Sequence, residues 1–512
     1  MSEVSSNNKR IAKNTLLLYF RMLLTMVVSL YTSRVVLQTL GVEDYGIYNV
    51  VGGVVTMFAF INTAMSSATM RFMAFELGSG NNEKLHRVFC TSIGIHAIIS
   101  LLIFLLAETI GLWFLNTYMT IPEARMDAAH WTFHLSVLST IVLMMSVPYN
   151  ASIIAHEKMS AFAYISVLEV VLKLAVVYLL VIFDVDKLKL YAILIFSIQL
   201  LIRLIYGRYC SRHFAECHYI LVYDKYLFKE MTSFAGWSLF GNLAGVAYTQ
   251  GVNILLNIFF GPVVNAARAV AIQVQAAVQG FVVNFQMALN PQITKTYASG
   301  ELDQMHRLVF ASGRYSFFLL LFLSLPIIIE IDPILSFWLE TVPEYTSTFI
   351  RLMLCIMMVD ALANPLITAA QATGRIKVYQ AVVGSILLLI VPFSYIALKL
   401  GGQPEIVFIV HFLMVVLAQI ARLIMIRPMI QLSLKTYFME VVMRIACVVL
   451  VAIMMPIGGY FLLPKDTFYS FFTVCALSII SVSLSVYYLG IGNSERTFVR
   501  EKIKDFKLKI FK

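Results

Sequence analysis

The feature that most constrains this chain is a succession of fourteen apolar windows, each about twenty residues long and joined by short links. They run at 15–39, 46–68, 88–107, 128–147, 160–183, 188–207, 234–258, 263–286, 309–329, 346–366, 378–398, 405–426, 439–463 and 468–490. Windows of this length span a bilayer as helices, whereas the strands of a membrane barrel are about half as long and alternate in polarity. Only 13% of the 512 residues are charged, too few to cover a soluble protein. We therefore predict an all-α integral membrane protein and exclude a soluble enzyme, a disordered chain and a disulfide-stapled secreted module.

Basic residues orient these windows in the membrane. With the N-terminus placed in the cytoplasm, the inner segments hold 26 of the 38 Lys and Arg residues and seven more lie within windows. The outer links hold only five: Arg125, Lys187, Lys189, Lys399 and Lys465. Cytoplasmic links carry this excess in membrane proteins, so both termini are predicted to be cytoplasmic and the first window to be a retained span. The net charge of +10 then belongs to the cytoplasmic face and does not indicate nucleic-acid binding.

An internal repeat divides the chain. Ser79, Gly80, His86 and Arg87 recur 220 residues later as Ser299, Gly300, His306 and Arg307, and Gly41 maps onto Gly261 by the same offset. Because six windows separate the copies, both enter the membrane from the same side, and a pseudo-two-fold axis along the membrane normal is expected. The predicted domains are an N-terminal lobe (1–208), a cytoplasmic link (209–233), a C-terminal lobe (234–426), two extra spans (427–490) and a basic tail (491–512).

The tail mixes basic and apolar side chains from Glu495 to Lys512. This pattern is typical of an amphipathic helix lying on anionic lipid, with membrane lipids as the partner. A simple basic stop signal is the alternative.

Several short segments resemble a known family. The turn Leu40-Gly41-Val42-Glu43-Asp44-Tyr45-Gly46 resembles the LG-x-x-x-YG turn of bacterial polysaccharide exporters, as do residues 65–72 and the Ser79-Gly80 link. Residues 290–294 and 298–301 look like the second-lobe equivalents. With fourteen spans, the chain resembles the O-antigen flippase (Wzx-type) branch of the multidrug/oligosaccharidyl-lipid/polysaccharide (MATE-like) transporter superfamily. The resemblance implies alternating access in a bacterial cytoplasmic (inner) membrane. It also implies a polyprenyl-pyrophosphate-linked oligosaccharide as the substrate for surface polysaccharide or lipopolysaccharide biosynthesis, and other polysaccharide-assembly proteins as partners.

Polar residues inside apolar windows are the candidate site, because buried polar groups in membranes usually face a bundle interior or a wet cavity. One stripe in the first window comprises Arg21, Thr25, Ser29 and Thr32. A second stripe in the eighth window comprises Asn265, Arg268, Gln275, Gln279 and Gln286. We predict that both stripes line a cationic cavity between the lobes and that the guanidinium groups bind the pyrophosphate. The alternative is that these side chains only hold the bundle together.

Two acids are candidates for coupling to H+ or Na+. Glu169 lies four residues before Lys173 in the fifth window, and Asp360 lies near Asn364 in the tenth. A neutralised structural pair is the alternative for Glu169, and a partner for an Arg of the same lobe is the alternative for Asp360. The remaining window-end arginines are interpreted as side chains that snorkel to the interface: Arg34, Arg314, Arg351 and Arg444.

No other chemistry is indicated. Cys210, His213, Cys217 and His218 have the residue types but not the spacing of a zinc site, so no metal or cofactor is expected. The chain has no phosphate-binding loop, so transport is not expected to use its own ATP hydrolysis. The rival functions are a cation-coupled multidrug exporter of the same superfamily and a membrane sugar polymerase or ligase. An enzyme of that kind needs a long outer loop, and the outer links here are short, so we expect no enzymatic activity.

Overall fold

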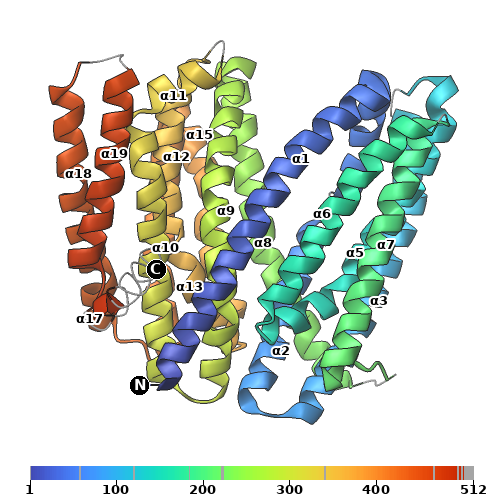
Figure 1. Cartoon of the computed structure of the whole chain (residues 1–512), viewed down its shortest axis with the longest axis horizontal. Helices are drawn as coiled ribbons and strands as arrows, with labels where there is room; N and C mark the ends of the chain where they lie inside the picture. Colours follow the sequence, from blue (N-terminus) through green and yellow to red (C-terminus); the bar gives the residue numbers. More distant parts are fainter. Residues whose placement is uncertain are drawn as a thin grey trace, which may run out of the picture. The chain divides into compact units, whose positions relative to one another are not determined.

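The computed structural model describes residues 2–500 except for short gaps at 57–58, 119–120, 184, 221–223, 340–341, 465–467, 493–494 and 498–499. Every regular element in these ranges is a helix (Figure 1). The α-helices of the first half are α1 (Ser2–Thr56), α2 (Ala59–Ser79), α3 (Asn82–Leu106), α4 (Leu112–Tyr118), α5 (Met126–Ala155), α6 (Met159–Ile182), α7 (Lys187–His213), α8 (Lys225–Phe260) and α9 (Pro262–Ala298). Those of the second half are α10 (Leu302–Ile329), α11 (Ile331–Trp338), α12 (Thr346–Asp360), α13 (Ala363–Ala372), α14 (Lys377–Leu388), α15 (Ile390–Lys399), α16 (Ile406–Ile430), α17 (Leu434–Tyr437), α18 (Arg444–Leu462) and α19 (Phe468–Ser485). Short 3-10 or π turns continue them: η1 (Ala107–Gly111), η2 (Glu123–Arg125), η3 (Ala215–Cys217), η4 (Phe438–Met443) and η5 (Val486–Gly490).

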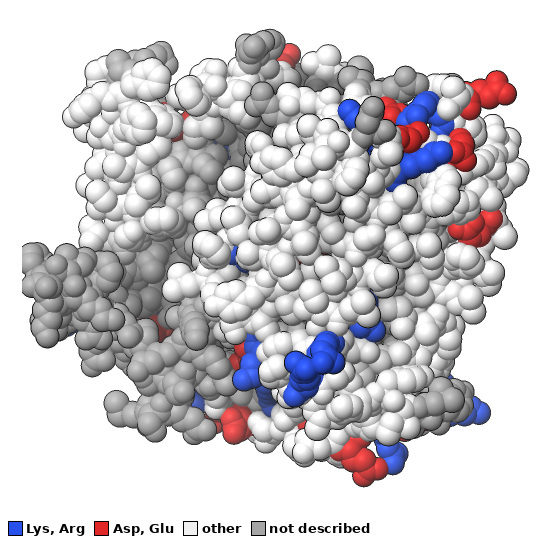
Figure 2. Space-filling model, turned by 45° about the vertical axis from the view of Figure 1, so that its right-hand side comes forward, with Lys and Arg blue, Asp and Glu red and all other residues white. Residues whose placement is uncertain are grey.

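Twelve helical stretches in the described residues are long and apolar enough to cross a membrane. They coincide with the predicted windows from 88–107 onward, which confirms an all-α membrane protein. The first two predicted windows lie in α1 and α2, which are not among the twelve, so the predicted count of fourteen is not confirmed. On the face shown in Figure 2, charged side chains gather mainly near the helix ends, as expected of a surface that meets lipid.

The chain packs as two compact units. Unit 1 comprises Met1–Leu243 together with Met287–Glu301, and unit 2 comprises Ala244–Gln286 together with Leu302–Lys512. In unit 1, α5 packs along α7 and α2, and α1 packs along α6 (Figure 1). In unit 2, α10, α12 and α16 form the packed centre, and α18 pairs with α19. Each unit thus has its own helix-packed interior.

The backbone repeats at the offset that the sequence indicates. Gly41 and Gly261 both have a φ of 79°, and Gly80 and Gly300 have φ values of 72° and 81°. Positive φ is easily adopted only by glycine, so these turns need the glycine that both copies carry. Two histidines at the same offset make matching contacts, since His86 Nε2 donates to the carbonyl oxygen of His218 and His306 Nε2 donates to that of Ile430 (2.7 and 2.8 Å). The first copy therefore fixes the beginning of α3 to the chain after α7, and the second fixes the beginning of α10 to the last residue of α16.

An arginine clamp holds one end of unit 1. Arg125 donates through Nε to Asp44 Oδ1 (2.8 Å) and through Nη1 to Asp186 Oδ2 (2.9 Å). Asp186 also caps α7 by accepting from the backbone N–H groups of Leu188 and Lys189. Partial burial alone would raise the pKa of the Asp186 carboxyl, but the Lys189 N–H and the Arg125 guanidinium outweigh it and hold the pKa below its usual value. The clamp therefore joins α7 to the chain just after the Gly41 bend of α1.

The last turns of α9 belong to unit 1 through a buried carboxylate. Glu157, in the turn between α5 and α6, accepts from Lys295 Nζ (2.9 Å) and Gln292 Nε2 (3.0 Å). Its side chain is only 3% exposed, so these donors compensate for the loss of water around the carboxylate. Close packing adds to this contact, because a Cβ on Gly78 of α2 would lie 2.5 Å from the carbonyl oxygen of Lys295.

The predictions for the window-end arginines have mixed outcomes. Arg314 is 6% exposed and lies 3.6 Å from Glu440 and 3.4 Å from Glu495, so the snorkelling prediction is wrong for this residue. Its charge is paired inside the unit instead of reaching the interface. Arg351 pairs with Asp332 (2.8 Å), and Arg444 pairs with Glu440 (2.7 Å). The side chain of Arg34 and the tail from 501 onward lie outside the described residues.

Candidate functional site

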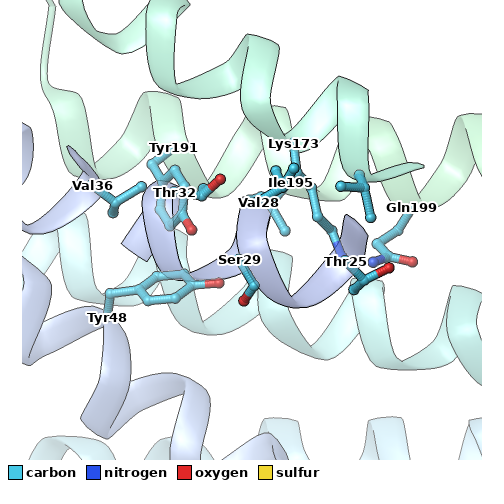
Figure 3. A pocket seen from close by; sticks show the side chains of 11 residues that line it. Thr25, Val28, Ser29, Thr32, Val36, Tyr48, Lys173, Tyr191, Ile195 and Gln199 are labelled. Atoms are coloured by element: carbon cyan, nitrogen blue, oxygen red, sulfur yellow. The ribbon is translucent and has the colours of Figure 1, made fainter. Parts of the chain in front are cut away.

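A polar pocket lies inside unit 1, between α1, α6 and α7 (Figure 3). Its cavity volume is about 380 Å3. The polar lining residues are Thr25, Ser29, Thr32, Tyr48, Lys173, Tyr191 and Gln199, and the apolar ones are Val28, Val36, Val170 and Ile195. The spacing of the first three follows one face of a helix, which is why α1 presents them together.

One end of the pocket carries an ion pair. Lys173 Nζ donates to Glu169 Oε1 (2.6 Å), one turn earlier on α6. Gln199 Nε2 of α7 donates to the same oxygen at 3.3 Å. Figure 3 shows Lys173 and Gln199 converging beside Thr25. The Glu169–Lys173 pair predicted from the sequence spacing is therefore formed, and it lies at the pocket.

Arg21 lies one turn before Thr25 on the same helix. Its guanidinium lies over the ring of Phe162, 4.7 Å from the ring centre, and is close enough to Glu169 and Tyr206 to interact electrostatically. The structure thus brings Arg21, Thr25, Ser29 and Glu169 into one polar column within unit 1. Arg21 is not itself among the residues that line the pocket.

The second predicted stripe lies in unit 2 and is more strongly braced. Arg268 is 5% exposed, and its guanidinium donates to Asn253 Oδ1 and to the carbonyl oxygen of Thr249 (3.1 Å), both on α8. Asn265 Nδ2 donates to the carbonyl oxygen of Asn253 (3.2 Å). These are the bracing contacts that the alternative interpretation expects. Yet the Nε of Arg268 and the Oδ1 of Asn265 have no hydrogen-bond partner among the described residues. One donor and one acceptor of this cluster are therefore left unsatisfied.

The glutamines of that stripe differ in their surroundings. Gln275 is half-buried and Gln279 is exposed, and neither joins the cluster around Arg268. Gln286 is 2% exposed and bonds Ser316 (2.9 Å), the Ala361 carbonyl oxygen (3.1 Å) and Asn364 (2.6 Å). Because these contacts satisfy its amide, Gln286 joins α9 to α10 and to the α12–α13 segment.

Asp360 ends α12 inside unit 2, within electrostatic reach of Arg422 and Tyr248. Tyr248 also interacts with Arg268, so it lies between the acid and the arginine stripe. Arg422 donates to the Tyr379 hydroxyl (3.2 Å) and to Gln419 Oε1 (3.3 Å). The structure therefore places an arginine of the same unit within electrostatic reach of Asp360, as the structural alternative predicts.

The sequence prediction missed half of the pocket. The polar stripes do not predict Tyr48, Tyr191 or Gln199, and the spacing predicts Lys173 only as a partner of Glu169. A polar residue in an apolar window was a usable signal for Gln199, whereas tyrosines near window ends are common interface residues and carry no such signal.

The cysteines and histidines near 210–218 are bonded to groups other than a metal site. Cys210 contacts the Tyr149 carbonyl oxygen, Cys217 contacts Ser152, and His213 bonds Tyr209 of its own helix. In the described part of the chain, no group of three or more His, Cys, Asp or Glu residues is arranged to hold a metal ion.

The fold of these two units is shared with solved membrane transporters. A MATE protein in its bent conformation is 13% identical, with a TM-score of 0.73 over 84% of this chain and 97% of that one. An outward-facing multidrug resistance MATE transporter of the MOP superfamily is 14% identical, with a TM-score of 0.70 over 83% of this chain and 96% of that one. A MOP-superfamily transporter from Pyrococcus furiosus is 15% identical, with a TM-score of 0.65 over 83% of this chain and 96% of that one. These likenesses show that the chain has the fold of MATE and other MOP-superfamily membrane transporters.

Within that class, the family can be stated. The model of the family described as polysaccharide biosynthesis protein matches residues 10–297, more than half of the chain, so the chain belongs to this family. The uncharacterized membrane protein EpsK of Bacillus subtilis is 27% identical over 125 residues, which span about a quarter of each protein (24% of this chain and 25% of EpsK). The resemblance to the polysaccharide branch of the superfamily is thereby confirmed.

Proposed function

We propose that this transporter moves a polyprenyl-pyrophosphate-linked oligosaccharide from the cytoplasmic to the outer leaflet of a bacterial cytoplasmic membrane by alternating access. The family match carries the proposal, because it ties a MOP-superfamily fold to polysaccharide biosynthesis. The membrane placement of both termini in the cytoplasm rests on the distribution of basic residues.

The chemistry of the two polar stripes supports a substrate that carries negative charge and hydroxyl groups. A pyrophosphate must leave water during transfer, and guanidinium groups offset part of that cost through charge-assisted hydrogen bonds. Arg21 and Arg268 are the guanidiniums of the two polar stripes, with Thr25, Ser29 and Asn265 beside them and Gln275 and Gln279 farther along α9. A multidrug exporter for cations would instead need acids that face the substrate.

Purified protein in liposomes tests this proposal. Lipid-linked oligosaccharide with a fluorescent sugar label should become accessible to an external quencher without any nucleotide. Protein-free liposomes are the control. A strict requirement for ATP, or transport of an organic cation with none of the lipid-linked sugar, would contradict the proposal, and the latter result would favour the multidrug alternative.

Coupling is assigned to one of two acids. Glu169 and Asp360 are the candidates for binding H+ or Na+ within the membrane. Glu169→Gln or Asp360→Asn should abolish the response of transport to an imposed ion gradient while downhill exchange continues. Asp303→Asn, at an exposed acid in the first turn of α10, is the matched control. A normal gradient response in both variants would rule out both acids.

A further inference from the structure

We infer that the pocket between α1, α6 and α7 binds one sugar ring of the glycan, uncharged and rich in hydroxyls, and does not bind the pyrophosphate. This inference rests on the proposed function for the presence of a glycan. It goes beyond that proposal because it divides the substrate between two kinds of site. The pocket lies wholly within unit 1, so the inference needs no particular arrangement of the two units.

The charge of the pocket argues against a diphosphate. Among the described residues that line the pocket, Lys173 is the only basic one, and its ammonium is already 2.6 Å from Glu169. A diphosphate would therefore face an ion pair with no net charge, and it would lose hydration without gaining a free cation. A sugar hydroxyl carries no net charge and avoids this cost.

The polar groups of the lining suit hydroxyl partners. Thr25, Ser29 and Thr32 place three hydroxyls along one face of α1, and Gln199 adds an amide from α7. Hydroxyls donate and accept, and an amide does both at once, so together they can match a ring whose hydroxyls also do both. In Figure 3, the Tyr48 hydroxyl points toward Ser29, so a further group of this kind borders the same space.

The size and the walls of the pocket suit a ring with two faces. A volume of about 380 Å3 lies at the small end of the range of about 300–1,000 Å3 for small-molecule pockets, enough for a sugar ring but not for a repeat unit with its lipid. The rings of Tyr48 and Tyr191 meet edge to face with centres 4.8 Å apart. With Val28 and Ile195, the two tyrosine rings supply apolar surface for the C–H face of a pyranose. The threonine and serine hydroxyls can then form hydrogen bonds with the hydroxyls around the sugar ring.

Protection of a thiol tests the inference without any lipid-linked substrate. Ser29→Cys places a thiol at an exposed position of the lining, and its reaction with a maleimide is followed by mass spectrometry of that peptide. Methyl glycosides of common hexoses and N-acetylhexosamines are the probes, with sodium pyrophosphate at equal ionic strength as the anionic comparison. At least one glycoside should slow labelling several-fold, and pyrophosphate should not. The native Cys447, exposed on α18 in unit 2, is the internal control and should react at an unchanged rate.

A second variant reports on the pocket itself. In the Ser29→Cys background, Gln199→Leu should raise the glycoside concentration needed for half-protection about tenfold, as expected for one lost hydrogen bond to a ligand. Ser197→Ala is the matched control on α7, because Ser197 bonds the Ile193 carbonyl oxygen of its own helix and does not line the pocket. Protection by pyrophosphate, or no protection by any glycoside, would overturn the inference. Liposomes that flip the lipid-linked sugar without such protection would refute the pocket alone, whereas protection without flipping would refute the proposed function alone.

Discussion

At the scale of single residues, the two arginines predicted to bind the head group have different surroundings. Arg21 lies half-buried over an aromatic ring, whereas Arg268 is buried and bonded to α8. Removing a buried charge that joins two helices costs folding free energy, up to about 3–5 kcal/mol for a fully buried pair. Arg21 is only half-buried, with its guanidinium over the Phe162 ring and within electrostatic reach of Glu169.

We therefore expect Arg268→Gln to lower the amount of folded protein in the membrane more than Arg21→Gln does, because Arg268 is buried and Arg21 only half-buried. Transport per folded molecule should fall to background in both variants, because each loses a guanidinium that is proposed to bind the pyrophosphate. Arg→Lys should retain part of the rate, since the charge remains but the planar fork is lost. Quantified membrane abundance and liposome flipping measure the two effects separately. Full transport per molecule in either Gln variant would remove that arginine from the substrate path.

Asp186 gives a prediction on pH. Its carboxyl has a pKa below the usual value in the folded protein, so its ionised form favours folding. This contribution is complete above the unfolded pKa of about 3.9 and is lost as pH falls through the lower folded pKa. Wild-type Tm should drop in that acid range by more than the Tm of Asp186→Asn, which lacks the titrating group. Equal acid sensitivity of the two proteins in a thermal-shift measurement would show that the clamp contributes nothing.

At the scale of elements, the contact between α2 and the end of α9 depends on a missing side chain. Gly78→Ala would place its Cβ 2.5 Å from a backbone oxygen, which cannot move cheaply, so a loss of about 1–3 kcal/mol in unfolding free energy is expected. Gly94→Ala is the matched control in α3, because its Cβ meets nothing within 4 Å. That control should be neutral or slightly stabilising. Equal thermal stability of the two variants would contradict the close packing.

The helices were predictable from the sequence to a greater extent than the contacts between them. Apolar length alone located the twelve spans from α3 onward, and the 220-residue offset located both pairs of positive-φ glycines. The pocket was found in part, since helical periodicity groups Thr25 with Ser29 but cannot tell which residues of α6 and α7 lie opposite them. Arg314 shows the same limit, because its partners Glu440 and Glu495 are more than 120 residues away in the chain.

At the scale of the whole molecule, the membrane orientation is the property most open to a direct test. Reporter fusions at Leu40, Asp186 and Lys465 should report an outer location, and fusions at Ser79, Glu216 and Lys512 a cytoplasmic one. The reason is the 26-to-5 distribution of basic residues between the two sides. An outer report at Glu216 would mean that the first lobe has an odd number of spans.

The two separate segments of unit 1 have a consequence for synthesis. A ribosome reaches Met287–Glu301 only after it has made α8 and most of α9, so Lys295 and Gln292 arrive late at Glu157. Until then, the nascent first bundle holds a carboxylate without its two donors, a state that costs free energy in an apolar interior. The contact that ties the end of α9 to the first bundle therefore forms only after synthesis of the second unit has begun.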